Sequence, residues 1–165
     1  MTVITTIEDL RVLYKKRVPK MFYDYADSGS WTEGTYRANE ADFQGIKLRQ
    51  RVAVNMENRT TATKMVGVDT KMPVAIAPVG LTGMQSADGE IKAAKAAEKF
   101  GIPFILSTMS ICSIEDIAAN TTAPFMFQLY MMRDREAMAR MIDRCKVAKC
   151  SALVLTLDLQ VIGQR

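Results

Sequence analysis

Four short apolar runs divide the second half of the chain. They cover residues 73–78, 103–107, 124–130 and 152–158. Each run is too short for a buried helix and is flanked by Pro, Gly or polar residues, so each predicts a buried strand. Between them lie segments with helical spacing or helix-start signals, at residues 91–100, 113–120 and 133–149. The pattern therefore predicts strands that alternate with helices.

Local signals fix the ends of these helices. Residues 87–90 open the first helix, and Gly101 is expected to end it. Residues 113–116 resemble a capping box, because a Ser is followed three positions later by an acidic residue. The third helix has apolar positions 137, 138, 141 and 142 on one side.

The first part of the chain has a different pattern. Thr6 followed by acidic residues predicts a helix start. Pro19 suits the first turn of a second helix, which Gly29 would stop, and a third helical stretch runs from about residue 32 to 43. Residues 48–70 predict irregular or short β structure. We expect a single domain over 1–165, made of a helical lead-in (1–47), a connecting segment (48–71) and a β/α section (72–165).

Alternating strands and helices indicate a parallel α/β sheet, which is either an open doubly wound sheet or a closed barrel. Two features favour the barrel. No Gly-x-Gly-x-x-Gly follows any strand, and every expected strand ends in polar or special residues, as the active-site end of a (β/α)8 barrel requires. A complete barrel needs eight strands and about 250 residues. We therefore expect the first four β/α units, the N-terminal half of a TIM barrel.

Composition excludes several classes of protein. The 165 residues are 48% apolar with a net charge of +4, and their basic residues form no dense stripe, so we expect no nucleic-acid partner. No apolar run approaches the roughly 20 residues of a membrane span, and the first nine residues lack a secretory pattern. Three cysteines without a CxxC pair predict neither disulfides nor a metal site. A cytoplasmic location fits.

The chain contains no histidine. Histidine is the usual general base near neutral pH and the commonest imidazole metal ligand. Any chemistry here must therefore use other groups, a cofactor, or residues outside this sequence.

Polar residues at the strand ends are the main candidate site, and they would converge on one face of the sheet: Ser107, Gln128, Tyr130, Thr156 and Asp158. None forms a nucleophile–base pair. Neutral donors and acceptors of this kind suit a flat heterocycle with several hydrogen-bonding edges. Alternatively, each side chain satisfies local backbone groups or caps the next helix, and the spacing alone leaves both interpretations open.

Five sequence blocks in a fixed order shift that balance: residues 19–25 (PKMFYDY), 76–80 (IAPVG), 106–108 (LST), 127–130 (FQLY) and 155–158 (LTLD). Together they resemble the FMN-dependent 2-hydroxy-acid dehydrogenase and oxidase family, over nearly the whole chain. The stretches 72–83 and 93–107 look most like the bacterial L-lactate dehydrogenases.

The resemblance implies a β/α barrel with FMN at the carboxyl ends of the strands. Six residues would contact the cofactor: the backbone of Ala77, Pro78 and Val79, and the side chains of Ser107, Gln128 and Thr156. Tyr25, Tyr130 and Arg165 would bind the substrate. Tyr130 and Asp158 would take part in catalysis, with Asp158 supporting a catalytic histidine that this chain does not contain.

The activity implied is oxidation of an L-2-hydroxy acid, foremost L-lactate to pyruvate. A quinone or oxygen would be the final electron acceptor. The resemblance is compatible with a homo-oligomer and with peripheral association at the inner face of the membrane. Met109 replaces a tryptophan found in some relatives, and residues 159–160 replace a Thr-Pro-like turn. The alternative is a non-catalytic half-barrel that self-associates.

Overall fold

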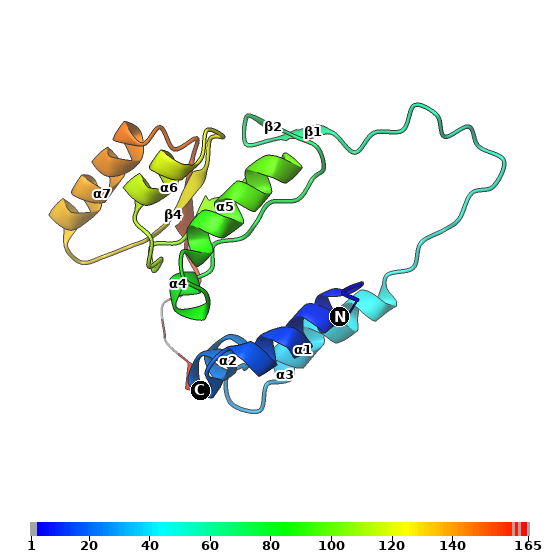
Figure 1. The fold of residues 1–165 in the computed structure, drawn as a ribbon, viewed down its shortest axis with the longest axis horizontal. Coiled ribbons are helices and arrows are strands. Elements are labelled where there is room, and N and C mark those ends of the chain that lie inside the picture. The colour runs from blue at the N-terminus through cyan, green and yellow to red at the C-terminus, as the bar shows by residue number, and fades with distance from the viewer. Residues whose placement is uncertain (1–2, 160, 162, 165) are drawn as a thin grey trace. The chain divides into compact units, whose positions relative to one another are not determined.

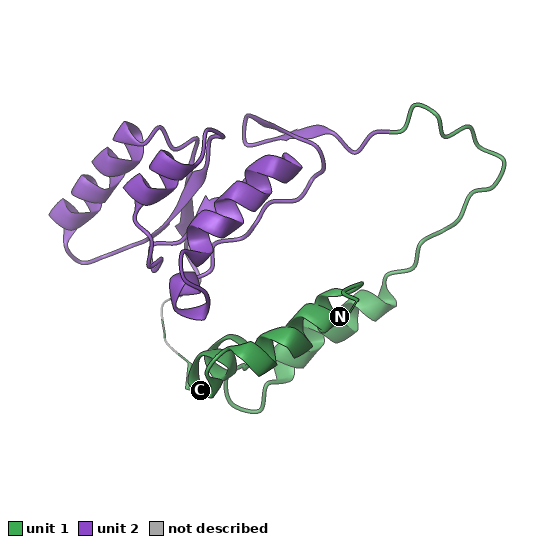
Figure 2. Ribbon diagram, in the orientation of Figure 1, with its two compact units in different colours: residues 1–59, 160–165 green, residues 60–159 purple. Residues whose placement is uncertain are grey.

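A computed structural model describes residues 3–159, 161, 163 and 164 of the chain. They form two compact units, coloured separately in Figure 2. Unit 1 comprises Met1–Arg59 and Gln160–Arg165, and unit 2 comprises Thr60–Leu159. The predicted single-domain organisation stays a prediction, and each unit is described by itself.

Unit 1 is helical. Its elements are α1 (Ile7–Arg17), α2 (Lys20–Ala26), α3 (Gly34–Ala41) and a 3-10 turn, η1 (Asp42–Gly45). The helix start predicted at Thr6 is confirmed, because Thr6 forms a reciprocal capping box with Asp9. Pro19 is the residue before α2, where its fixed φ and missing N–H cost the helix nothing.

One carboxylate joins the helices of unit 1. Asp27, just after α2, accepts hydrogen bonds from Arg11 Nη1 at 3.0 Å, from the Tyr36 hydroxyl at 3.3 Å and from the Tyr23 hydroxyl. Burial alone would raise the pKa of Asp27, but these donors hold it below its ordinary value. Tyr23 is the buried aromatic residue of this unit.

Unit 2 begins with an antiparallel hairpin, β1 (Thr63–Met65) and β2 (Val68–Thr70). A three-stranded parallel sheet follows: β3 (Ile105–Leu106), β4 (Met126–Tyr130) and β5 (Leu153–Thr156). The predictions of strands near these three positions are confirmed, with shorter bounds.

The prediction of a strand at residues 73–78 is wrong, because no strand forms there. The segment makes a single parallel bridge, between Ile76 and Phe104. Ile76 donates to Pro103 O at 2.9 Å and accepts from Ile105 N at 3.1 Å. Two residues after Ile76, Pro78 has no N–H to extend this ladder, and two residues before it Val74 N donates to Met72 O instead, so the pairing stops at its one bridge.

Four helices connect these elements: α4 (Thr82–Gln85), α5 (Gly89–Phe100), α6 (Ile114–Asn120) and α7 (Arg135–Val147). The last three confirm the predicted helices. Ser113 and Asp116 form the predicted capping box of α6. Gly101 ends α5 with a φ of 84°, a left-handed conformation that glycine adopts without strain. The short helix α4 was not predicted.

Strand order in the parallel sheet follows chain order, β3-β4-β5, with the bridge at Ile76 beside β3. Right-handed crossovers between successive neighbours place every connecting helix on the same face. The helices α5, α6 and α7 lie side by side in Figure 1. A doubly wound sheet would instead reverse its strand order and use both faces, so the topology agrees with a barrel-type sheet. The described sheet is open, and the expectation of four complete β/α units stays unconfirmed.

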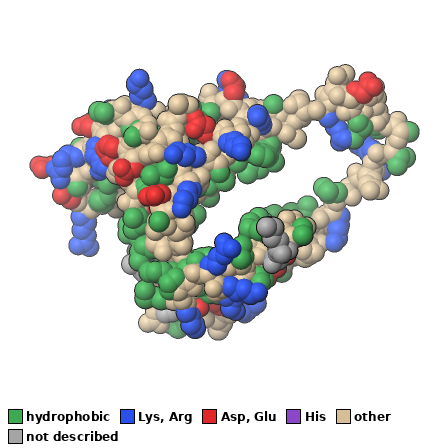
Figure 3. Space-filling view, in the orientation of Figure 1, with side chains coloured by type: hydrophobic (Ala, Val, Ile, Leu, Met, Phe, Trp, Pro, Cys, Tyr) green, Lys and Arg blue, Asp and Glu red, His purple; other side chains and the backbone are tan. Residues whose placement is uncertain are grey.

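The core lies between this sheet and its helices. Phe127 and Leu129 of β4 are buried with Leu106 of β3 and Ile117 of α6. Because successive strand residues point to opposite faces, Gln128 faces away from the helix layer. On the outside of α6 and α7, basic and acidic side chains are interspersed, as the upper left of Figure 3 shows. Among the described residues, none of the helices combines the length and apolarity needed to cross a membrane.

An ion pair joins the neighbouring helices α6 and α7 of unit 2. Arg144 of α7 donates from Nε and from Nη2 to the two carboxylate oxygens of Glu115 on α6, at 2.7 and 2.6 Å. This hydrogen bonding lowers the pKa of Glu115 from 4.5 to about 2. Both side chains are about half exposed, so solvent screening limits the contribution of the pair to stability.

Replacing Arg144 with Met keeps the alkyl chain and removes the ion pair. We expect the free energy of unfolding at pH 7 to fall by about 0.5–1 kcal/mol. Because the folded pKa of Glu115 is depressed, the contribution is complete above pH 4.5 and is lost as the pH falls toward about 2. Urea denaturation at several pH values measures both effects.

Lys146→Met is the matched control, since its partner Asp143 lies on the same helix at 2.9 Å and links no second element. We expect a smaller change for this variant. An Arg144→Met deficit that persists unchanged at pH 2 would contradict the assignment to Glu115.

Candidate functional site

A chain of side-chain hydrogen bonds crosses the three parallel strands at their carboxyl ends. The Ser107 hydroxyl, just after β3, donates to Gln128 Oε1 at 3.3 Å. Gln128 Nε2, on β4, donates to Thr156 Oγ1 on β5 at 2.8 Å. The structure therefore brings together the three side chains that the sequence analysis expected to contact a cofactor.

Gln128 is the centre of this chain and is only 2% exposed. Its Oε1 accepts a second hydrogen bond, from Thr108 N at 3.1 Å. These contacts fix which end of the amide is oxygen, because Oε1 meets a backbone N–H, which can only donate. Nε2 carries two hydrogens, of which one has an acceptor among the described residues, so the second remains able to donate.

The donor set tests whether a flavin fits. Ser107 and Thr156 each add a hydroxyl that can donate or accept. The resulting row of neutral groups matches the alternating nitrogen and carbonyl edge of a flat heterocycle, without placing a charge against it. The arrangement is compatible with the predicted role of Ser107, Gln128 and Thr156 as cofactor ligands, and that role stays a prediction.

Thr108 belongs to the same hydrogen-bond network, and its role there was not predicted from the sequence. Its hydroxyl donates to the main-chain carbonyl oxygen of Gln128 and accepts from Tyr130 N at 3.3 Å. The signal was its position, since a hydroxyl residue directly after the end of a buried strand often bonds the neighbouring strand's backbone.

Tyr130 and Asp158 follow the same strand ends. Tyr130 is the last residue of β4 and pairs in register with Thr156. It lies two residues after Gln128, so its side chain leaves the same face of the sheet. Asp158 lies two residues beyond Thr156 and is exposed. Their substrate and catalytic roles stay predictions.

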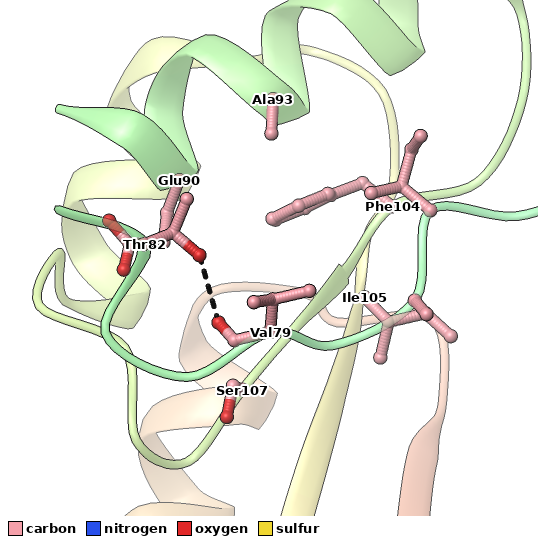
Figure 4. A pocket seen from close by; sticks show the side chains of 9 residues that line it. Val79, Thr82, Glu90, Ala93, Phe104, Ile105 and Ser107 are labelled. Carbon is pink, nitrogen blue, oxygen red and sulfur yellow. Dashed lines mark hydrogen bonds between the residues drawn. The ribbon is translucent and has the colours of Figure 1, made fainter. Parts of the chain in front are cut away.

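The segment after the Ile76 bridge forms the wall of a cavity of about 110 Å³. Ala77 and Val79 line it together with Ser107, whereas Pro78 does not. Figure 4 shows Val79, Thr82 and Ser107 near one end of this cavity, with the Thr82 hydroxyl donating to the Val79 carbonyl at 3.0 Å. The expected contact between the backbone of residues 77–79 and a flavin stays a prediction.

Two expected substrate residues do not belong to unit 2. Tyr25 is on α2 in unit 1 and is about half exposed. Arg165 lies outside the described residues. Both assignments stay predictions.

The three cysteines differ in environment and none belongs to the strand-end network. Cys112 and Cys145 are buried, and Cys150 is partly buried. Burial raises the pKa of Cys150 to about 12, which keeps it a neutral thiol at physiological pH. Within the described part of the chain, no group of His, Cys, Asp and Glu residues is arranged to hold a metal ion.

Sequence comparison agrees with the pattern of motifs. Residues 14–165 match the model of the FMN-dependent dehydrogenase family. The L-lactate dehydrogenase of Ectopseudomonas mendocina is 45% identical over 163 residues, which is 99% of this chain and 43% of that protein. The L-lactate dehydrogenase of Acinetobacter baumannii gives the same values. The chain thus spans less than half the length of these curated relatives.

Solved structures give the same result for the fold. A soluble mutant of the membrane-associated (S)-mandelate dehydrogenase from Pseudomonas putida has a TM-score of 0.94 at 37% identity, over 99% of this chain and 46% of that one. Mandelate oxidase with (S)-4-hydroxymandelic acid has a TM-score of 0.93 at 30% identity, over 98% of this chain and 45% of that one. The suspected family is thereby confirmed. This chain belongs to the FMN-dependent dehydrogenase family.

Proposed function

We propose that this chain supplies the flavin-ring side of the active site in an enzyme that oxidises an L-2-hydroxy acid, L-lactate to pyruvate, with FMN as the electron acceptor. The observation that carries the proposal is the hydrogen-bonded row of Ser107, Gln128 and Thr156. This row of three neutral side chains, of which Ser107 and Gln128 are buried, provides donors and acceptors for a heterocycle edge.

FMN, when bound, accepts the two electrons that leave the hydroxy acid. The role of Gln128 and its neighbours is to hold the ring in place and to offer hydrogen-bond donors where its electron density rises. Because Gln128 is fixed by three hydrogen bonds before any ligand arrives, its orientation costs little on binding.

The substrate side of the proposal rests on the residues that the family resemblance implies. Tyr25 and Tyr130 would donate hydrogen bonds to the carboxylate or hydroxyl of the substrate, and Arg165 would pair with its carboxylate. Asp158 would orient a catalytic histidine. That histidine has no counterpart in this sequence, so we propose that turnover requires residues outside it.

Lactate is the proposed substrate because the curated relatives are L-lactate dehydrogenases. Electrons would pass onward to a quinone or to oxygen. One similar structure is a monotopic membrane protein, (S)-mandelate dehydrogenase, which supports a peripheral position at the cytoplasmic face of the membrane. A homo-oligomer is also proposed.

The chain is expected to bind FMN, and Thr156→Val should weaken that binding about three- to tenfold, because it removes the acceptor that holds Gln128 Nε2. Titration of FMN fluorescence with the purified chain measures the dissociation constant. Ser107→Ala should act in the same direction.

Thr70→Val provides the matched control. It removes a buried hydroxyl from β2 that accepts nothing from the strand-end row and bonds Met72 O at 2.9 Å. We expect the FMN affinity of this variant to stay at the wild-type value. Equal losses in all three variants would show that the site residues act only through general stability.

A chimera tests the substrate. Joining residues 1–165 to the remaining part of the Ectopseudomonas mendocina L-lactate dehydrogenase should give a protein whose flavin absorbance is bleached by L-lactate without oxygen. The remaining part of the relative would supply the catalytic histidine that the family resemblance implies. A chimera that holds FMN but reacts with no short L-2-hydroxy acid would reject the proposed activity.

A second candidate is a non-catalytic, self-associating half-barrel. The observation that favours it is the exposure of two leucines on one face of the edge strand β5, where Leu153 and Leu155 are 45% and 46% exposed. Exposed apolar residues on an edge strand promote association. Sedimentation of the chain at several concentrations distinguishes the two candidates, since association that prevents FMN binding would favour the second.

A further inference from the structure

A buried carboxylate lies beside the candidate site and has no part in the function proposed above. Glu90 is the second residue of α5 and is only 2% exposed. Its Oε1 accepts hydrogen bonds from Gly83 N and from Ile111 N, both at 3.0 Å. One oxygen atom thus joins two separate turns of the chain.

These two turns follow the segments expected to contact the flavin. Gly83 belongs to α4, which begins three residues after Val79, and Ile111 belongs to the turn that begins at Ser107. The turns also touch directly, because Leu81 N donates to Met109 O at 2.9 Å. Glu90 therefore fixes the spacing between two walls of the candidate site.

The chain packs closely at the two glycines beside Glu90, Gly83 and Gly89. A Cβ on Gly83 would lie 2.6 Å from Ile111 Cβ and 3.0 Å from Glu90 Oε2. A Cβ on Gly89 would lie 2.6 Å from the Thr82 carbonyl oxygen. Such distances are far below normal contact, so α4, α5 and the turn at Ile111 are locked together at glycine positions.

The second oxygen of Glu90 is unusual. Oε2 is buried and has no hydrogen-bond partner among the described residues. Glu90 also lines the cavity shared with Val79 and Ser107, as Figure 4 shows. Burial alone would raise the pKa of Glu90, but the N–H groups of Ile111 and Gly83 lower it, so the group is charged at neutral pH.

A buried carboxylate with only one oxygen in short hydrogen bonds is costly, because the Cys112 thiol that also interacts with Glu90 is a weak donor. The charge strengthens both backbone hydrogen bonds and also favours the N-terminal end of α5. The missing hydrogen bond at Oε2 offsets part of the stabilisation that the two hydrogen bonds of Oε1 provide.

We propose that Glu90 is a positioning residue of the flavin site, which holds the turn after Val79 and the turn after Ser107 at the spacing that FMN binding requires. This inference rests on the proposed FMN site. It concerns a residue that does not touch the reacting atoms and acts through the backbone of Gly83 and Ile111.

Two variants and one control test it. Glu90→Ala removes both hydrogen bonds, whereas Glu90→Gln keeps an oxygen that can accept them and removes the charge. Glu98→Ala is the control, because Glu98 lies on the same helix and also accepts from two backbone N–H groups, Thr122 and Ala123, both at 2.9 Å. Those residues precede β4, at the opposite end of the sheet from Gln128.

Amide hydrogen exchange of the whole chain gives a readout that needs no cofactor. In Glu90→Ala, exchange at Gly83 and Ile111 should accelerate at least about tenfold relative to the sheet amide of Phe127. In Glu98→Ala these two amides should keep their wild-type rates relative to Phe127. Glu90→Gln should retain most of the protection.

FMN titration gives the second readout. Glu90→Ala should weaken FMN binding about tenfold, Glu90→Gln by a smaller factor, and Glu98→Ala not at all. A wild-type sequence that binds no FMN, either alone or within the chimera described above, rejects the proposed function. Unchanged exchange at Gly83 and Ile111 in Glu90→Ala, or FMN affinity equal to wild type, rejects the role of Glu90.

Discussion

The candidate site depends on one side-chain amide, that of Gln128. It lies on the middle strand of the parallel sheet and reaches a hydroxyl on each neighbouring strand. A side chain in this position can act on both neighbours only because all three strands run in the same direction and end at the same edge. The strand order β3-β4-β5 is therefore what turns three distant polar residues into one surface.

Much of this arrangement follows from local sequence. The helix that starts at Thr6, the capping box at Ser113 and the end of α5 at Gly101 each follow from a side chain acting on its own backbone. The polar strand ends were also predictable, because hydroxyl and amide residues directly follow apolar runs. The family resemblance then assigned a role to residues whose spacing alone left two interpretations open.

The remainder depends on contacts between distant segments. The strand expected at residues 73–78 is reduced to a bridge because Pro78 cannot donate and Val74 N bonds Met72 O, and the apolar pattern does not show either loss. Glu90 looked like an ordinary helix-start acid, since no local pattern shows that its oxygen meets Gly83 and Ile111. The role of Thr108 likewise requires knowledge of which strand lies beside it.

The close approach at Gly83 and Gly89 also bears on how this part of the protein diverges. Any side chain at position 83 collides with Ile111 and with the carboxylate of Glu90, and any side chain at position 89 collides with a main-chain oxygen. Single replacements at these positions are therefore incompatible with the present backbone. A side chain at position 83 requires a change at Ile111, and one at position 89 requires a shift of the main chain, so substitutions should accumulate on the outer helix faces long before they appear here.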